Sequence, residues 1–222
     1  PATFEKLTER ALADMQWEEC LVYIDDVIIF GRTFLEVLQR LGKVLERFRQ
    51  YQLKIKAKKC DLFKKIVEFL GHLVSEDGIQ CDPKKIDKIS KWPTPKNVSE
   101  VRSFLGLAGY YRKFIENFST LAGPLVELTQ KDVPFQWGET QEFSMQELKR
   151  CLTTAPVLAY PDVSSTFLLD TDASGTGIGG VLSQVQADGE EKPVAYASFT
   201  LNRSQRRYCT TKRELLAMVL MI

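Results

Sequence analysis

The four residues Tyr23-Ile24-Asp25-Asp26 constrain the fold of this chain more than any others. Apolar runs rich in β-branched residues flank them, over residues 20–24 and 27–30. Such runs around a short polar pair predict a β-hairpin with both carboxylates exposed at or beside its tip. Adjacent carboxylates repel each other and are costly to bury, so a dry turn favours them only beside a cation. Oxygen ligands on a rigid turn suit Mg²⁺ or Mn²⁺, although Asp is also a common turn residue without any metal.

The composition is typical of a soluble globular protein with one or two domains. Of the 222 residues, 44% are hydrophobic and 27% are charged, which are both ordinary values. No apolar run approaches the ~18 residues of a membrane span, and no secretory signal pattern opens the chain. We therefore expect no membrane partner and no secretion. Because the chain starts at Pro1 and stops at Ile222 in an apolar helical run, we expect both ends to be cut from something longer.

The cysteines and the histidine argue against two further classes of protein. There are five scattered cysteines without a Cys-x-x-Cys pair, and one histidine, His72, that has no partner. The cysteines are Cys20, Cys60, Cys81, Cys151 and Cys209. This pattern disfavours a zinc site or a disulfide framework and indicates a reducing, intracellular compartment.

The charged residues are distributed unevenly along the chain, although the net charge is only +1. Residues 1–39 carry three basic and eight acidic side chains, whereas residues 40–65 carry ten basic and two acidic ones. Residues 82–113 carry eight basic and three acidic side chains. Basic segments beside an acidic site suit a nucleic-acid enzyme, with phosphates on Lys and Arg and metal on the carboxylates. The alternative is an ordinary solvated surface rich in lysine.

Hydrophobic periodicity and capping signals predict a mixed α+β chain. Expected helices cover residues 4–15, begin at the capping boxes 33–36 and 97–100, cover 139–152 and begin near Thr211. Expected strands are residues 53–57 with their lysines on one face, a hairpin region over 67–75, and an antiparallel meander of 166–172, 178–185 and 193–199. The two prolines of residues 92–95 break both helix and strand and indicate a boundary.

A second pair of carboxylates lies in the last part of the chain. Asp172 ends the first meander strand and precedes a turn of small residues, so its side chain is expected at the rim of the sheet. Glu214 lies on the final helix, and the two could converge on one metal if that helix packs across the meander. The alternatives are a turn-forming role for Asp172 and a capping box, residues 211–214, for Glu214.

Six strings of residues together resemble one known family. The chain is similar throughout to the polymerase polyprotein of gypsy-type LTR retrotransposons and, more distantly, to retroviral reverse transcriptases. The strings are Pro1–Phe4, Cys20–Asp26, Phe69–His72, Trp92–Pro95, Phe104–Ile115 and Thr171–Ser174. The resemblance implies a reverse-transcriptase palm hairpin and helical thumb, followed by an incomplete RNase H-like α/β domain. The implied parts are the palm at 1–76, the thumb at 77–132, a connecting segment at 133–163 and the start of RNase H at 164–222.

The resemblance also implies roles for particular residues. Asp25 and Asp26 match the palm carboxylates that bind the catalytic metals, Mg²⁺ or Mn²⁺, while Asp172 and Glu214 match the first two metal ligands of the nuclease. The residues implied to bind primer and template are Tyr23 at the primer end, Phe69, Leu70, Gly71 and His72 of the primer grip, and Lys56, Lys58 and Lys59 near the nucleotide phosphates. Two metals in such a site activate the primer hydroxyl and neutralise the leaving pyrophosphate.

The implied partners are an RNA template, a DNA primer, RNA–DNA hybrid, deoxynucleotide triphosphates and the rest of the polyprotein. The implied location is the cytoplasm, in a virus-like particle, or the nucleus. The family's first palm carboxylate would precede Pro1, and the remaining nuclease ligands would follow Ile222. We therefore expect these residues alone to be inactive. The alternative function is a non-catalytic, nucleic-acid-binding remnant of a decayed or domesticated element.

Overall fold

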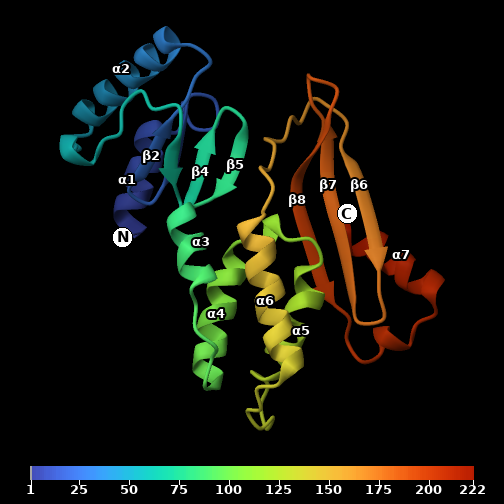
Figure 1. The fold of residues 1–222 in the computed structure, drawn as a ribbon. Helices are drawn as coiled ribbons and strands as arrows, with labels where there is room; N and C mark the ends of the chain where they lie inside the picture. The colour runs from blue at the N-terminus through green and yellow to red at the C-terminus, as the bar shows by residue number, and fades with distance from the viewer. Residues whose placement is uncertain (1) are drawn as a thin grey trace. The chain divides into compact units, whose positions relative to one another are not determined.

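The computed structural model describes residues 2–222, which form two compact units that divide between Leu70 and Gly71 (Figure 1). Helices and antiparallel strands are both present, so the α+β prediction is confirmed. None of the helices in the described range is long and apolar enough to cross a membrane.

The first unit is built around a two-stranded hairpin. Its elements are α1 (Ala2–Leu12), β1 (Cys20–Tyr23), β2 (Asp26–Ile29), α2 (Phe34–Gln50), the 3₁₀ turn η1 (Ala57–Lys59) and β3 (Val67–Phe69). Both α1 and α2 contact the hairpin, and together they bury Leu12, Met15, Cys20 and Val44. Helix α2 begins as its capping box predicts, because the Thr33 hydroxyl accepts a hydrogen bond from the Glu36 amide at 3.2 Å.

The strand expected over residues 53–57 is absent, which corrects the sequence prediction. Residues 53–56 have no regular structure and lead into η1. An alternating pattern makes a strand only if a neighbouring strand can take up its backbone hydrogen bonds. Residues 53–57 have no ladder partner among the described residues.

The first part of the second unit is a layer of helices over a short hairpin. Its elements are β4 (His72–Ser75), β5 (Gly78–Cys81), α3 (Pro83–Ser90), α4 (Val98–Tyr110), η2 (Arg112–Phe114), α5 (Phe118–Glu127) and α6 (Glu139–Thr153). One hydrophobic core joins α3, α4, α5 and α6, and its largest fully buried side chains include Phe104, Tyr111, Leu125 and Leu148. The predicted cap of α4 is confirmed, since the Asn97 side chain accepts a hydrogen bond from the Glu100 amide at 3.0 Å.

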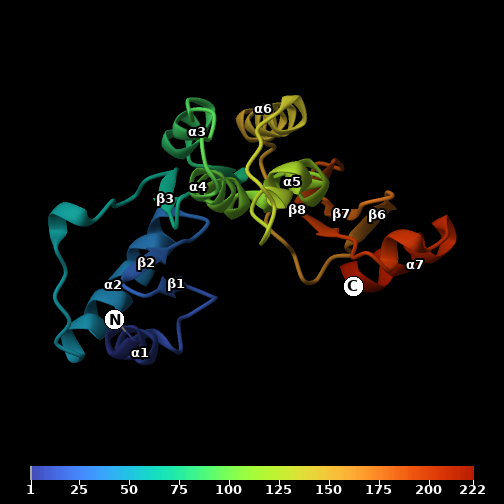
Figure 2. The same ribbon diagram turned by 90° about the horizontal axis from the view of Figure 1, so that it is seen from below.

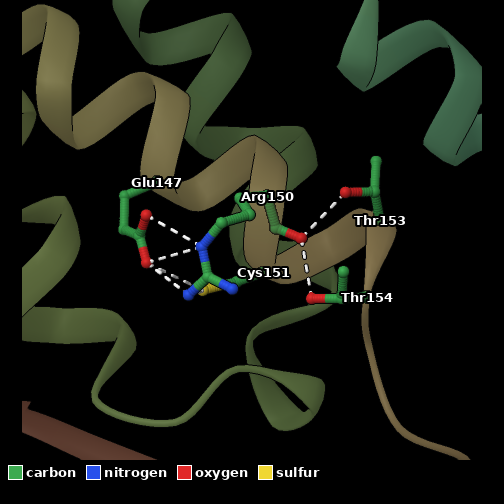
Figure 3. A network of polar contacts seen from close by, with 5 residues as sticks. All are labelled: Glu147, Arg150, Cys151, Thr153 and Thr154. Carbon is green, nitrogen blue, oxygen red and sulfur yellow. Dashed lines mark hydrogen bonds and ion pairs between the residues drawn. The ribbon is translucent and has the colours of Figure 1, made fainter.

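The end of α6 directs the chain from the helical layer back toward β5. The hydroxyls of Thr153 and Thr154 donate to the Arg150 carbonyl at 2.8 and 3.0 Å, while the Arg150 guanidinium binds Glu147 (Figure 3). The chain then runs extended, and Leu158 pairs with Ile79 of β5 through two backbone hydrogen bonds. Only glycine fits at position 78, where φ is +133° and a Cβ would lie 2.2 Å from the Leu158 oxygen.

The predicted antiparallel meander is present. Its strands are β6 (Leu168–Ala173), β7 (Gly177–Val185) and β8 (Glu191–Thr200), followed by the turn η3 (Gln205–Arg207) and helix α7 (Thr210–Met221). A three-stranded sheet under one helix would leave a face uncovered. Instead, α7 packs on β6 and β7 from one side, and α5 packs on β7 and β8 from the other (Figure 2).

Helix α7 begins at Thr210, close to the predicted start near Thr211, but it lacks the predicted capping box. Its N-cap is Cys209, whose side chain makes no capping hydrogen bond, and Thr211 already lies inside the helix. The capping box over residues 211–214 is therefore wrong as an explanation of Glu214.

Candidate active site

The hairpin of β1 and β2 places Asp25 and Asp26 at its tip, as the sequence predicts. Tyr23 pairs with Asp26 in register, so Ile24 and Asp25 form a two-residue turn. Ile24 has φ of +53°, a left-handed conformation that β-branched residues rarely adopt. Strained residues of this kind are concentrated at functional sites, where the surrounding structure holds them in place. Both carboxylates are exposed.

Neither carboxylate has a cationic partner within the described part of the chain. Two basic side chains of α2 pair with other carboxylates of the same unit: Lys43 with Glu19, and Arg47 with Asp14 at 2.7 Å. Two unpaired, adjacent, exposed carboxylates are the oxygen donors that Mg²⁺ or Mn²⁺ prefers. Among residues 2–222 no three His, Cys, Asp or Glu side chains form a metal-binding group. A metal at the hairpin would therefore have two carboxylates within the described residues, and water, substrate phosphate or another carboxylate would have to complete its shell.

Tyr23 and the three lysines implied to bind primer or nucleotide are all accessible. The Tyr23 side chain, directly across the hairpin from Asp26, is 52% exposed. Lys56, Lys58 and Lys59 lie at and within η1, and all three are exposed. None of them forms an ion pair in the described residues, so their charges are available to an anion.

The residues implied to form the primer grip surround a tight turn. Leu70 and Gly71 both have positive φ, 48° and 66°, the conformation that a type I′ turn needs at its two central positions. Phe69 is the last residue of β3, and His72 is the first of β4. Within the second unit, the Tyr111 hydroxyl donates a hydrogen bond to the Gly71 carbonyl at 2.6 Å.

The His72 ring lies in an aromatic cage. It stacks on Tyr110 with 5.4 Å between centroids and meets the edge of Tyr111 at 5.5 Å. Its Nδ1 atom is buried without a hydrogen-bond partner. Burial, with a smaller effect from the nearby Lys113 ammonium, lowers the pKa of His72 from 6.5 to about 4. The sequence contains the signal for this cage, the Tyr110-Tyr111 pair, but sequence reasoning did not connect it to His72.

We expect His72 to make the chain less stable in mild acid. Because its pKa is lower in the folded state than in the unfolded state, only the unfolded chain takes up the proton as pH falls below about 6.5. The stability that the neutral His72 ring gives the folded state is fully present above about pH 6.5, and it is lost as the pH falls towards 4. The chain has one histidine, so thermal unfolding at pH 7 and pH 5 should isolate the effect. His72→Phe should keep the cage and flatten this pH dependence, and an unchanged dependence would contradict the assignment.

Asp172 and Glu214 lie on elements that pack together. Asp172 is exposed near the end of edge strand β6, and Glu214 is exposed in the first half of α7. The Arg213 guanidinium donates a hydrogen bond to the Ser174 carbonyl at 2.8 Å, which ties the start of α7 to the chain just after Asp172. The structure thus confirms that the helix packs across the meander. Within the described range, neither carboxylate belongs to a group of three or more side chains that could hold a metal ion.

Comparison with known proteins identifies the two halves of the chain separately. A family model described as reverse transcriptase (RNA-dependent DNA polymerase) matches residues 1–74. A second, described as an RNase H-like domain found in reverse transcriptase, matches residues 137–222.

Individual relatives match the chain almost from end to end. The retrovirus-related Pol polyproteins from transposons opus and gypsy of Drosophila melanogaster are 37% and 39% identical over 99% and 95% of the chain. The transposon Tf2-3 polyprotein of Schizosaccharomyces pombe is 36% identical over 99%. The chain spans only 23%, 21% and 16% of the length of these three relatives.

Solved structures of foamy viral protease-reverse transcriptase are similar over the whole chain. One, the dRH form in complex with double-stranded DNA, superposes with a TM-score of 0.88 at 26% identity, and the chain covers 39% of it. Another, in complex with RNA/DNA hybrid, gives 0.85 at 26% identity, with 30% covered.

The hairpin, the helical layer and these matches show that the chain carries sequence of a reverse-transcriptase domain and of an RNase H-like domain. More specifically, the chain is similar along nearly its whole length to Pol polyproteins of retrovirus-related transposons, among them gypsy, opus and 297, which confirms the resemblance found in the sequence.

Proposed function

We propose that the chain serves an RNA-directed DNA polymerase with an attached ribonuclease H, which copies RNA into DNA and degrades the RNA of the hybrid. The observation that carries the proposal is the pair of exposed carboxylates at the Asp25-Asp26 tip, which lie beside a strained Ile24 and have no cationic partner among residues 2–222. Relatives that are named as transposon polyproteins give no support to the alternative of a non-catalytic remnant.

Each residue then has a role in binding or positioning. Asp25 and Asp26 would hold Mg²⁺ or Mn²⁺, which supplies charge stabilisation for the transferring phosphoryl group. Tyr23 would contact the primer end, and the lysines of η1 would contact nucleotide phosphates. Phe69, Leu70, Gly71 and His72 would support the primer strand, and Tyr111 would hold the Gly71 carbonyl in place.

In the nuclease half, Asp172 and Glu214 would be metal ligands for cleavage of the RNA strand. The proposed parts are those implied by the resemblance: palm 1–76, thumb 77–132, connecting segment 133–163 and the start of RNase H at 164–222. The partners would be RNA template, DNA primer, RNA–DNA hybrid and deoxynucleotide triphosphates. The foamy viral relatives in complex with DNA and with RNA/DNA hybrid support the nucleic-acid partners.

The metal site can be tested without turnover by replacing Mg²⁺ with Fe²⁺ and adding hydrogen peroxide and ascorbate. The bound Fe²⁺ reduces the peroxide to hydroxide and a hydroxyl radical that cuts the nearby backbone, and ascorbate returns the Fe³⁺ to Fe²⁺. We expect cleavage close to Asp25 and Asp26, suppressed by excess Mg²⁺ and lost in the double variant Asp25→Asn/Asp26→Asn. The β4–β5 turn offers a matched control, because Glu76 and Asp77 form another exposed acidic pair between two strands. Asp77→Asn should leave the pattern unchanged. Cleavage that is unchanged in the Asp25→Asn/Asp26→Asn double variant would rule out a metal site at these two residues.

A further inference from the structure

Helix α5 belongs to two parts of the second unit at once. Its Ala122, Leu125 and the following Leu128 are buried in the core shared by the thumb helices. Its opposite side contacts strands β7 and β8 of the RNase H-like sheet. Helix α5 therefore cannot move with the other thumb helices unless the RNase H-like sheet moves with it.

The contact with the sheet is made by the N-terminal turn of α5 against two glycines of β7. A Cβ on Gly179 would lie 1.8 Å from the Asn117 Oδ1 atom, and one on Gly177 would lie 2.6 Å from the Thr120 hydroxyl. The Ser119 amide donates a hydrogen bond to the Ser198 hydroxyl on β8 at 2.8 Å. Asn117 itself has φ of +53°, a left-handed conformation that asparagine tolerates better than most residues.

Gly179 has a particular place in the sheet. In the β6–β7 register it lies directly opposite Asp172. Directly opposite residues of an antiparallel pair project their Cβ atoms to the same face, about 5 Å apart. The Asp172 side chain therefore lies on the face of the sheet that Asn117 contacts. The next pair, Ala173 and Ile178, lies on the other face, in the small core beneath α7.

We propose that Asn117 is a positioning residue for Asp172. Its side chain, on the first turn of the thumb helix α5, packs where only glycine fits and so fixes the strand pair that carries the carboxylate. The thumb helices and the carboxylate of Asp172 therefore move together. If nucleic acid displaces the thumb, Asp172 is displaced with it. The proposal rests on the nuclease role given above to Asp172, but the packing can be measured independently of that role.

The test is a double-substitution cycle with Gly179→Ala, Asn117→Gly and the combination. Gly179→Ala inserts a methyl group where Asn117 lies, so one of them must move. Asn117→Gly removes the obstacle and accepts the left-handed conformation. Gly123→Ala is the matched control. It also adds one methyl group, on helix α5, at a position where no atom lies within 4 Å of the new Cβ.

Hydrogen exchange of the intact 222-residue chain gives the first readout. We expect Gly179→Ala to speed exchange of the β6 amides and of the first turn of α5 together, by about tenfold. The double variant should match Asn117→Gly alone. Gly123→Ala favours the helix and should speed exchange in neither β6 nor α5. Additive effects, or exchange that changes in β7 without α5, would overturn the proposal.

Fe²⁺-dependent backbone cleavage at Asp172 gives the second readout and separates the two hypotheses. If Asp172 holds metal and Asn117 positions it, Gly179→Ala reduces this cleavage and Asn117→Gly in the same chain restores it. Loss of cleavage in Gly179→Ala that the second substitution does not restore would overturn the positioning role. No cleavage at Asp172 in the unsubstituted chain would reject the nuclease assignment, whereas the exchange cycle would still decide the packing.

Discussion

Primer extension on an RNA template should fall about 10³-fold when Asp25 is replaced by asparagine in a polyprotein that carries these 222 residues. The amide keeps the size of the side chain but removes a negative charge from the proposed metal site. A loss of 10³ corresponds to about 4 kcal/mol of transition-state stabilisation, a reasonable cost for one metal ligand. Because Asp25 is exposed and makes no ion pair in the described residues, the substitution should leave the fold intact.

The control for this prediction is Asp77→Asn, which changes an exposed carboxylate in another two-residue turn of the same chain. It should extend primers at the unsubstituted rate. Affinity for template-primer, measured by fluorescence anisotropy, should be similar in both variants, so that the loss appears in the rate and not in binding. An Asp25→Asn protein that keeps a tenth or more of the activity would contradict the metal role.

The features that the sequence predicted well are local ones. The hairpin follows from two apolar runs joined by a two-residue turn, and the meander follows from strands separated by short turns of small and polar residues. The caps at Thr33 and Asn97 need only a side chain and an amide three residues away. In each case the interactions that decide the structure lie within a few residues of one another.

The features that the sequence could not predict depend on distant parts of the chain. The alternation over residues 53–57 gives no strand because no partner strand lies alongside, and nothing in that segment reveals this. The face of the meander opposite α7 is covered by α5, and Asn117 at the start of that helix meets Gly179 far along the sequence. The capping box expected over residues 211–214 is also absent, because α7 begins at Thr210 without a side-chain cap.

In the candidate site, too, the local features could be predicted from the sequence, whereas the features that depend on distant residues could not. The exposed tip carboxylates follow from Tyr23-Ile24-Asp25-Asp26, but the strained φ of Ile24 is visible only in the structure. The His72 cage brings together β4 and the end of α4, so the lowered pKa could not be anticipated from either segment alone.

Binding to RNA–DNA hybrid should weaken by on the order of 10²–10³ between about 50 and 200 mM salt if about five phosphates are contacted. The basic segment 40–65 divides into two groups in the structure. Its α2 residues Arg40, Lys43, Arg47 and Arg49 pair with acidic side chains, so their charges are already used. Six further lysines are exposed and outside any ion pair among the described residues: Lys54, Lys56, Lys58, Lys59, Lys64 and Lys65. Only this second group should release counterions from the hybrid.

Two matched double variants test this division. Lys58→Gln/Lys59→Gln removes two unpaired charges from η1, and should lower the slope of log affinity against log salt by about two. Lys43→Gln/Arg47→Gln removes two charges that are held by Glu19 and Asp14, and should change the slope little. Fluorescence anisotropy of a labelled hybrid at a series of salt concentrations gives both slopes. Equal slopes in the two variants would show that net charge, and not the exposed lysines of η1, governs binding.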